Sequence, residues 1–171
     1  MKQEGSRLKI LPAIAEPDWG GRIHYITVTV HQDQLWPDAV MQVVGPDTSN
    51  VSDVCKVGHL YLPTGVGKKM AKMVLVSLAG GGDFAKAVAW AEKFDLKRTN
   101  PRQVFAIGEK MPELHKEIGM DPMYVIASEE CFFEGCQQIC DVWWYGSKRR
   151  ASLDWVSLAR GSRDWVAFLC E

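Results

Sequence analysis

The stretch Met123-Tyr-Val-Ile-Ala-Ser-Glu-Glu-Cys-Phe-Phe-Glu-Gly-Cys-Gln-Gln-Ile-Cys-Asp-Val-Trp-Trp-Tyr145 predicts a β-hairpin. Two runs rich in β-branched and aromatic residues, 123–133 and 136–146, flank the pair Glu134-Gly135. That pair can form a two-residue turn, although Asn-Gly would be a stronger turn signal. We therefore expect two adjacent antiparallel strands in the last third of the chain.

The turn also predicts which side chains share a face, because directly paired residues of two strands point to the same side of a sheet. Phe133 then pairs with Cys136, Cys131 pairs with Gln138, and Glu129 pairs with Cys140. The face that we expect to meet the core carries Met123, Val125, Ala127, Glu129, Cys131 and Phe133 from one strand, and Cys136, Gln138, Cys140, Val142 and Trp144 from the other. Trp143 and Tyr145 fall on the opposite face.

The rest of the chain predicts an α+β fold in a single domain, 1–171. We expect a β-rich N-terminal part, a central helix at about 83–96 and an antiparallel β-meander at the C-terminus. The predicted strands are 22–31, 39–44, 54–62, 103–107 and two adjacent strands at 153–159 and 164–170, and a short helix is predicted at 112–118. The alternative is an α/β fold with a β-α-β-α-β unit over 72–128.

Composition is that of an ordinary globular protein. The chain has 171 residues, of which 47% are hydrophobic and 24% charged, and its net charge of −1 gives no general attraction to nucleic acid. No apolar run reaches the roughly 20 residues of a membrane-spanning helix, and the start of the chain does not resemble a signal peptide. The five cysteines form no recognisable disulfide framework. We expect a soluble, cytoplasmic protein with reduced cysteines and no cofactor.

Three cysteines and one carboxylate lie on the expected core face. Cys131, Cys136 and Cys140 are interpreted as small buried hydrophobes, because they lack the Cys-x-x-Cys spacing of zinc sites and no histidine is near them in sequence. No metal is therefore predicted. Glu129 is the one candidate catalytic residue: buried, it could act as a general acid, whereas near a sheet edge it would only reach solvent.

A glycine-containing loop offers a candidate phosphate site. Leu62-Pro-Thr-Gly-Val-Gly-Lys-Lys69 resembles the P-loop of helicase-type NTPases, in which backbone N–H groups and a lysine hold phosphates. It departs from that motif at Lys69, where a serine or threonine would bind Mg²⁺, and at Leu62. An ordinary surface turn is the alternative. The residues that could contact phosphate are Thr64, Gly65, Gly67, Lys68 and Lys69.

Aromatic and basic residues alternate near the C-terminus. Arginine and tryptophan are favoured both at protein interfaces and on surfaces that stack nucleic-acid bases. The candidate binding residues are Trp143, Tyr145, Lys148, Arg149, Arg150, Arg160 and Arg163. The alternative is that the tryptophans fill the core while the basic residues lie in solvated turns.

Two functions follow from these features. The leading hypothesis is a non-catalytic macromolecule-binding protein, such as an adaptor or inhibitor, that docks on another protein through its C-terminal Trp/Arg-rich surface. The alternative is a phosphate-directed module that binds nucleic acid or nucleotide through Lys68, Lys69 and Lys148–Arg150. No catalytic constellation favours an enzyme.

Overall fold

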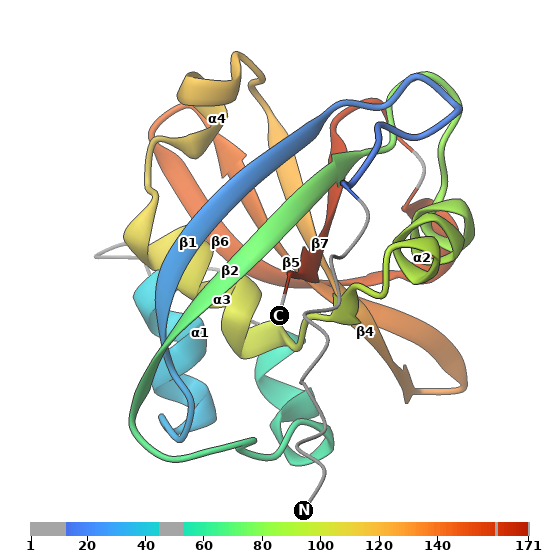
Figure 1. Cartoon of the computed structure of the whole chain (residues 1–171). Helices are drawn as coiled ribbons and strands as arrows, with labels where there is room; N and C mark the ends of the chain where they lie inside the picture. Colours follow the sequence, from blue (N-terminus) through green and yellow to red (C-terminus); the bar gives the residue numbers. More distant parts are fainter. Residues whose placement is uncertain (1–12, 45–52, 160, 171) are drawn as a thin grey trace, which may run out of the picture.

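A seven-stranded mixed sheet with helices on both faces forms the protein, which confirms the α+β prediction (Figure 1). The computed structural model describes residues 13–44, 53–159 and 161–170. The strands follow the order β1-β2-β7-β4-β5-β6, and β3 pairs with β7. They are β1 (Ile23–His31), β2 (Lys68–Ser77), β3 (Lys97–Arg98), β4 (Met123–Phe133), β5 (Cys136–Tyr145), β6 (Lys148–Trp155) and β7 (Asp164–Leu169).

The helices are α1 (Trp36–Val44), α2 (Phe84–Lys93), α3 (Pro101–Lys110) and α4 (Leu114–Ile118), with short 3₁₀ helices η1 (Val54–Leu60) and η2 (Val156–Leu158). The central helix α2 confirms its prediction, and the Asp83 side chain caps it by accepting a 2.8 Å hydrogen bond from the Lys86 backbone N–H. Helix α4 ends at Gly119, whose positive φ of 77° suits a helix stop.

The β4–β5 hairpin has the predicted turn. Glu134 and Gly135 both have positive φ, 49° and 79°, as a two-residue hairpin turn of type I′ requires. Phe133 lies opposite Cys136, as expected. The predicted division into faces is confirmed, since Trp144 is fully buried while Tyr145 is 56% exposed.

A bulge in β4 changes one predicted pair. Ile126 pairs with Asp141 and Glu130 pairs with Ile139, so the three β4 residues 127–129 face only Cys140. The expected direct pair between position 129 and Cys140 is therefore absent. Because the register shifts by two residues, side chains beyond the bulge stay on their predicted faces.

The C-terminal strands are arranged differently from the prediction. The antiparallel meander of β4, β5 and β6 is confirmed, but β7 is not next to β6: it lies between β2 and β4 and runs parallel to β4. The chain leaves the sheet edge after Trp155, and Val156 and Ala159 pack over the sheet on the way to its centre. The α/β alternative is wrong, because β2 is antiparallel to β7 and hence to β4.

Two predicted N-terminal strands are helical. Residues 39–44 belong to α1, where Trp36, Ala39, Val40 and Val43 lie on one buried face at helical spacing. Residues 54–60 form η1, and the ring of Trp36 lies so close to Gly58 that an added Cβ would be 2.6 Å from its Cγ. The N-terminal part is therefore one strand followed by helix, and not mainly β.

The predicted strand 103–107 is the middle of helix α3. Asn100 accepts from the Gln103 backbone N–H at 3.1 Å, and the Gln103 side chain accepts from the Asn100 backbone N–H at 2.8 Å. This is a capping box with Pro101 at the first helical position, so the proline starts α3 as well as ending the preceding segment. The helix is buried on most sides, and its apolar run resembles a strand for that reason.

The sheet curls around α3. Helix α3 contacts β1 and β6, which are the two edge strands of the sheet, and also β4 and β5. Figure 1 shows α3 between the β1–β2 pair and the β5–β6 pair. We call the side of the sheet that faces α1 and α3 the inner face, and the side that carries α2 the outer face.

Candidate functional site

Aromatic side chains form a stacked array on the outer face of β4, β5 and β6. The rings of Trp143 and Tyr145 are stacked with their centroids 5.6 Å apart, and the ring of Tyr124 lies 6.4 Å from that of Trp143. The Arg150 guanidinium lies 4.7 Å from the centroid of Trp143. We call Tyr124, Trp143, Tyr145 and Arg150 the aromatic platform. It brings together three of the predicted binding residues and one that the sequence did not reveal, Tyr124.

Strand pairing explains the platform. Trp143 pairs with Tyr124 on one side and with Arg150 on the other, so the three side chains form one row across the sheet. Tyr145 follows Trp143 by two residues and points to the same face. A cation above an aromatic ring is attracted to the electron-rich ring face, and this holds Arg150 in place.

The predicted basic residues are divided by the structure. Lys148 is exposed on the outer face near the platform, whereas Arg149 pairs with Trp144 and points to the inner side. Arg163 donates a 2.7 Å hydrogen bond to the Asp121 carbonyl and so anchors a turn. Arg160 lies outside the described residues. Lys148 and Arg150 therefore share the outer face and Arg149 does not, because neighbouring strand residues alternate between faces.

An acidic pocket of about 230 Å³ adjoins the platform and shares Tyr124 with it. Three aspartates from three different strands line it: Asp141 from β5, Asp154 from β6 and Asp164 from β7. Trp155 and Leu158 form part of its wall, and both are exposed. Carboxylates beside aromatic rings suit a positively charged group, which the carboxylates attract and the ring faces cover.

Asp141 lies beside Asp154 in this pocket and is its most buried carboxylate. Asp141 is only 2% exposed and accepts a hydrogen bond from the Ser152 hydroxyl. Burial raises the pKa of Asp141 well above its ordinary value, and the adjacent Asp154 carboxyl raises it further by repulsion and by accepting a hydrogen bond. Asp141 therefore keeps its proton at pH values where an ordinary aspartate is ionised.

The sequence contained one signal for this pocket. Asp141 lies two residues before Trp143 on a strand, and the hairpin register alone places both side chains on the outer face. Asp164 could not have been found in this way, because the position of β7 beside β4 depends on a long crossover of the chain.

Burial raises the pKa of Tyr124, and the three aspartates also raise it, so its phenol stays protonated beside them.

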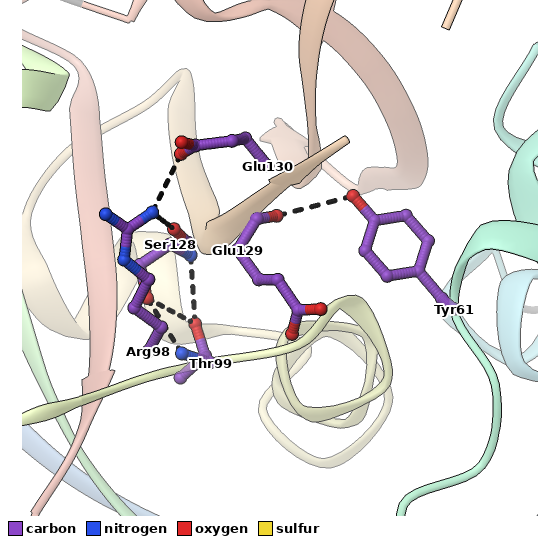
Figure 2. A network of polar contacts seen from close by, with 6 residues as sticks. All are labelled: Tyr61, Arg98, Thr99, Ser128, Glu129 and Glu130. Atoms are coloured by element: carbon purple, nitrogen blue, oxygen red, sulfur yellow. Dashed lines mark hydrogen bonds and ion pairs between the residues drawn. The ribbon is translucent and has the colours of Figure 1, made fainter. Parts of the chain in front are cut away.

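Glu129 lies in the β4 bulge. Beyond the bulge, β3 takes the place of β4 beside β7. The Glu129 backbone N–H donates to the Thr99 carbonyl at 3.0 Å, and its own carbonyl accepts from the Tyr61 hydroxyl at 3.3 Å. The side chain is exposed, partial burial raises its pKa, and Arg98 opposes that shift. Figure 2 shows no contact from this carboxylate to the other residues drawn.

Polar contacts join the strands around the bulge. The Thr99 hydroxyl donates to the Ala167 carbonyl at 2.8 Å and accepts from the Ser128 backbone N–H at 3.1 Å. The Ser128 hydroxyl accepts from the Thr99 backbone N–H at 2.7 Å. Arg98 reaches Glu130 at 2.9 Å (Figure 2). These contacts satisfy backbone groups that the bulge leaves without ladder partners, so the network holds the fold together.

The cysteines of the hairpin are not all buried. Cys131 and Cys140 lie in the core on the inner face, as expected, but Cys136 is exposed beside the turn. Burial raises the pKa of the Cys140 thiol well above its ordinary value, which disfavours the thiolate. No disulfide joins any pair of cysteines among the described residues.

The predicted phosphate loop leads into a strand. Lys68 and Lys69 are the first residues of β2 and pair with His31 and Val30 of β1. A P-loop is followed by a helix whose first N–H groups bind the phosphates, so the resemblance to that motif does not extend to the structure. Gly67 has a φ of 71°, and its N–H donates to the Asp33 carboxylate at 3.0 Å.

Only part of the predicted phosphate set comes together. Thr64 and Lys69 line a cavity of about 250 Å³ at the start of α3, while Gly65 packs against the Gln32 side chain. The Lys68 side chain points to the opposite face of the sheet from that of Lys69, because adjacent residues of a strand alternate between faces.

Comparisons with protein-family models, with curated proteins and with solved structures found no match. Within residues 13–44, 53–159 and 161–170, no group of three or more His, Cys, Asp or Glu side chains could hold a metal ion. No helix in that part of the chain is long and apolar enough to cross a membrane. Function is therefore inferred from the geometry of the platform and its neighbouring pocket.

Proposed function

We propose that the protein is a non-catalytic docking protein whose aromatic platform binds a segment of another protein. The observation that carries the proposal is the stack of Trp143, Tyr145 and Arg150 on an outer face that is open beside β5 and β6. Aromatic and arginine side chains that are already held in place lose little conformational freedom on binding, and such residues dominate the binding energy of protein interfaces.

The charges beside the platform favour a protein partner over nucleic acid. Asp154 and Asp164 lie at its edge and would repel phosphate groups that run along the platform. They would instead attract a basic side chain. We therefore propose a partner segment that places an apolar or aromatic side chain on the platform and a lysine or arginine at the acidic pocket. The cytoplasmic location that we propose rests on an odd number of cysteines without a disulfide framework.

Capture from nuclease-treated host extract tests this proposal, with the purified full chain as bait. We expect Tyr145→Ala and Asp154→Asn each to reduce the captured protein at least tenfold. Phe132→Ala is the matched control, because Phe132 is an exposed aromatic residue on the same hairpin, 69% exposed, away from the platform residues. Equal capture by wild type and Tyr145→Ala would contradict the proposal, as would capture that disappears with nuclease treatment.

A further inference from the structure

A second cavity lies on the inner side of the sheet at the beginning of α3. It encloses about 250 Å³ between β1, β2, β3, β7 and α3. The polar residues around it are Gln32, Thr64, Lys69, Lys97, Asn100, Arg102 and Gln103. They come from three segments that are distant in sequence, and the sheet and helix bring them to one place.

The cavity is positively charged. Lys69 of β2, Lys97 of β3 and Arg102 of α3 all line it, and none of the described residues that line it is an aspartate or glutamate. In the sheet, Lys97 is directly opposite Leu169, which itself lines the cavity. The ten-residue helix α3 begins here, so the positive end of its dipole adds to the field of the three cations.

Arg102 gives an independent indication of a bound anion. Its side chain is only 5% exposed and donates to the Gln34 carbonyl, and the guanidinium lies 5.6 Å from the centroid of the Trp36 ring. Its Nε has no hydrogen-bond partner among the described residues. A buried guanidinium is costly unless a negative charge or further acceptors compensate it. Burial lowers the pKa of Arg102 although Asp33 acts in the opposite direction, so the charge of Asp33 does not offset the burial, and the cavity that Arg102 lines has room for an anion.

We infer that this cavity binds the phosphate group of a small molecule, with Lys69, Lys97 and Arg102 supplying the charge and Thr64 and Asn100 available as polar neighbours. The residues differ from those of a P-loop, since Lys97 and Arg102 replace the glycine-rich backbone as the main source of positive potential. The cavity is separate from the aromatic platform, so this inference does not depend on the docking proposal.

Titration of the full chain with inorganic phosphate at constant ionic strength tests the inference. Binding is measured from the chemical shifts of the backbone amides in NMR spectra. We expect saturable shifts at residues 97–103, and little effect of acetate, which carries less charge. Parallel titration with adenosine monophosphate distinguishes the two sources: tighter binding than inorganic phosphate indicates a phosphate ester as the ligand, and equal or weaker binding indicates free phosphate.

Matched lysine variants make the test specific. Lys69→Gln and Lys97→Gln should each weaken phosphate binding at least fivefold. Lys68→Gln is the control, because Lys68 adjoins Lys69 in sequence but does not line the cavity, and it should leave the affinity unchanged. The inference is overturned if phosphate produces no saturable shift at 97–103, or if Lys68→Gln weakens binding as much as Lys69→Gln. Thermal unfolding of each variant separates lost binding from lost folding.

Discussion

The Arg150 guanidinium lies 4.7 Å from the centroid of the Trp143 ring, which joins edge strand β6 to the aromatic residues of β5. Arg150→Ala should lower the free energy of unfolding by about 1 kcal/mol, because it removes both the cation–π contact and the packing of the aliphatic stem. Lys148→Ala, at the exposed start of the same strand, should change it far less. Urea unfolding measures both, and equal effects would contradict the assigned role of Arg150.

The buried Asp141 should make stability depend on pH. In the unfolded chain the Asp141 carboxyl loses its proton near the ordinary pKa of 3.8. In the folded protein its pKa is raised, so it keeps the proton to a higher pH. The stabilising contribution is therefore complete below the unfolded pKa and is lost as pH rises through the folded pKa. Between the two, the free energy of unfolding should fall by up to about 1.4 kcal/mol per pH unit.

Asp141→Asn should remove that slope, since an amide does not titrate and can still accept the hydrogen bond of Ser152. Urea unfolding at a series of pH values from 4 to 8 compares the variant with the wild type. If the two proteins lose stability with pH in parallel, the proton is not held at Asp141.

Thr99 should be a stability residue. Thr99→Val keeps the shape of the side chain but removes the hydroxyl that donates to Ala167 and accepts from Ser128, so buried backbone groups lose their partners. We expect a loss of about 2–3 kcal/mol in the free energy of unfolding. Thr99→Ser, which keeps the hydroxyl, should lose less than half as much. A valine variant as stable as the wild type would show that this network is not needed at the bulge.

The β4–β5 turn can be improved. Glu134 has a positive φ of 49°, a conformation that asparagine adopts more readily than glutamate. Glu134→Asn should therefore raise the free energy of unfolding by about 0.5–1 kcal/mol. Gly135→Ala, at a φ of 79°, should lower it by about 1–2 kcal/mol. Thermal unfolding measures both variants. A Gly135→Ala protein more stable than the Glu134→Asn protein would contradict the turn assignment.

The hairpin could be predicted from sequence because its determinants are local. Glu134-Gly135 fixed the register, and the alternation of side chains then placed Trp143 and Trp144 on opposite faces. Only the bulge escaped prediction, since it depends on Thr99 and Tyr61 from elsewhere in the chain.

Short apolar runs were the source of the errors in secondary structure. Residues 103–107 are buried on most sides, and 39–44 is a short apolar run, so both patterns fit a strand or a helix equally well. The capping box at Asn100, with Pro101 at the first helical position, is a local signal for the start of a helix, but the apolar run 103–107 favoured a strand. Neither pocket could be predicted as a whole, although Thr64 and Lys69 were named beforehand, because each pocket assembles side chains from strands whose order is set by long crossovers.

Site-specific photo-crosslinking tests the docking proposal most directly. A photoreactive phenylalanine analogue is placed at Tyr145 of the full chain, or at Phe132 as the control, and each protein is irradiated in nuclease-treated host extract. The account predicts that position 145 forms a covalent adduct with a distinct protein, that position 132 does not, and that Asp154→Asn reduces the adduct. Adducts with nucleic acid in untreated extract only, or identical protein adducts from both positions, would contradict a docking role for the platform.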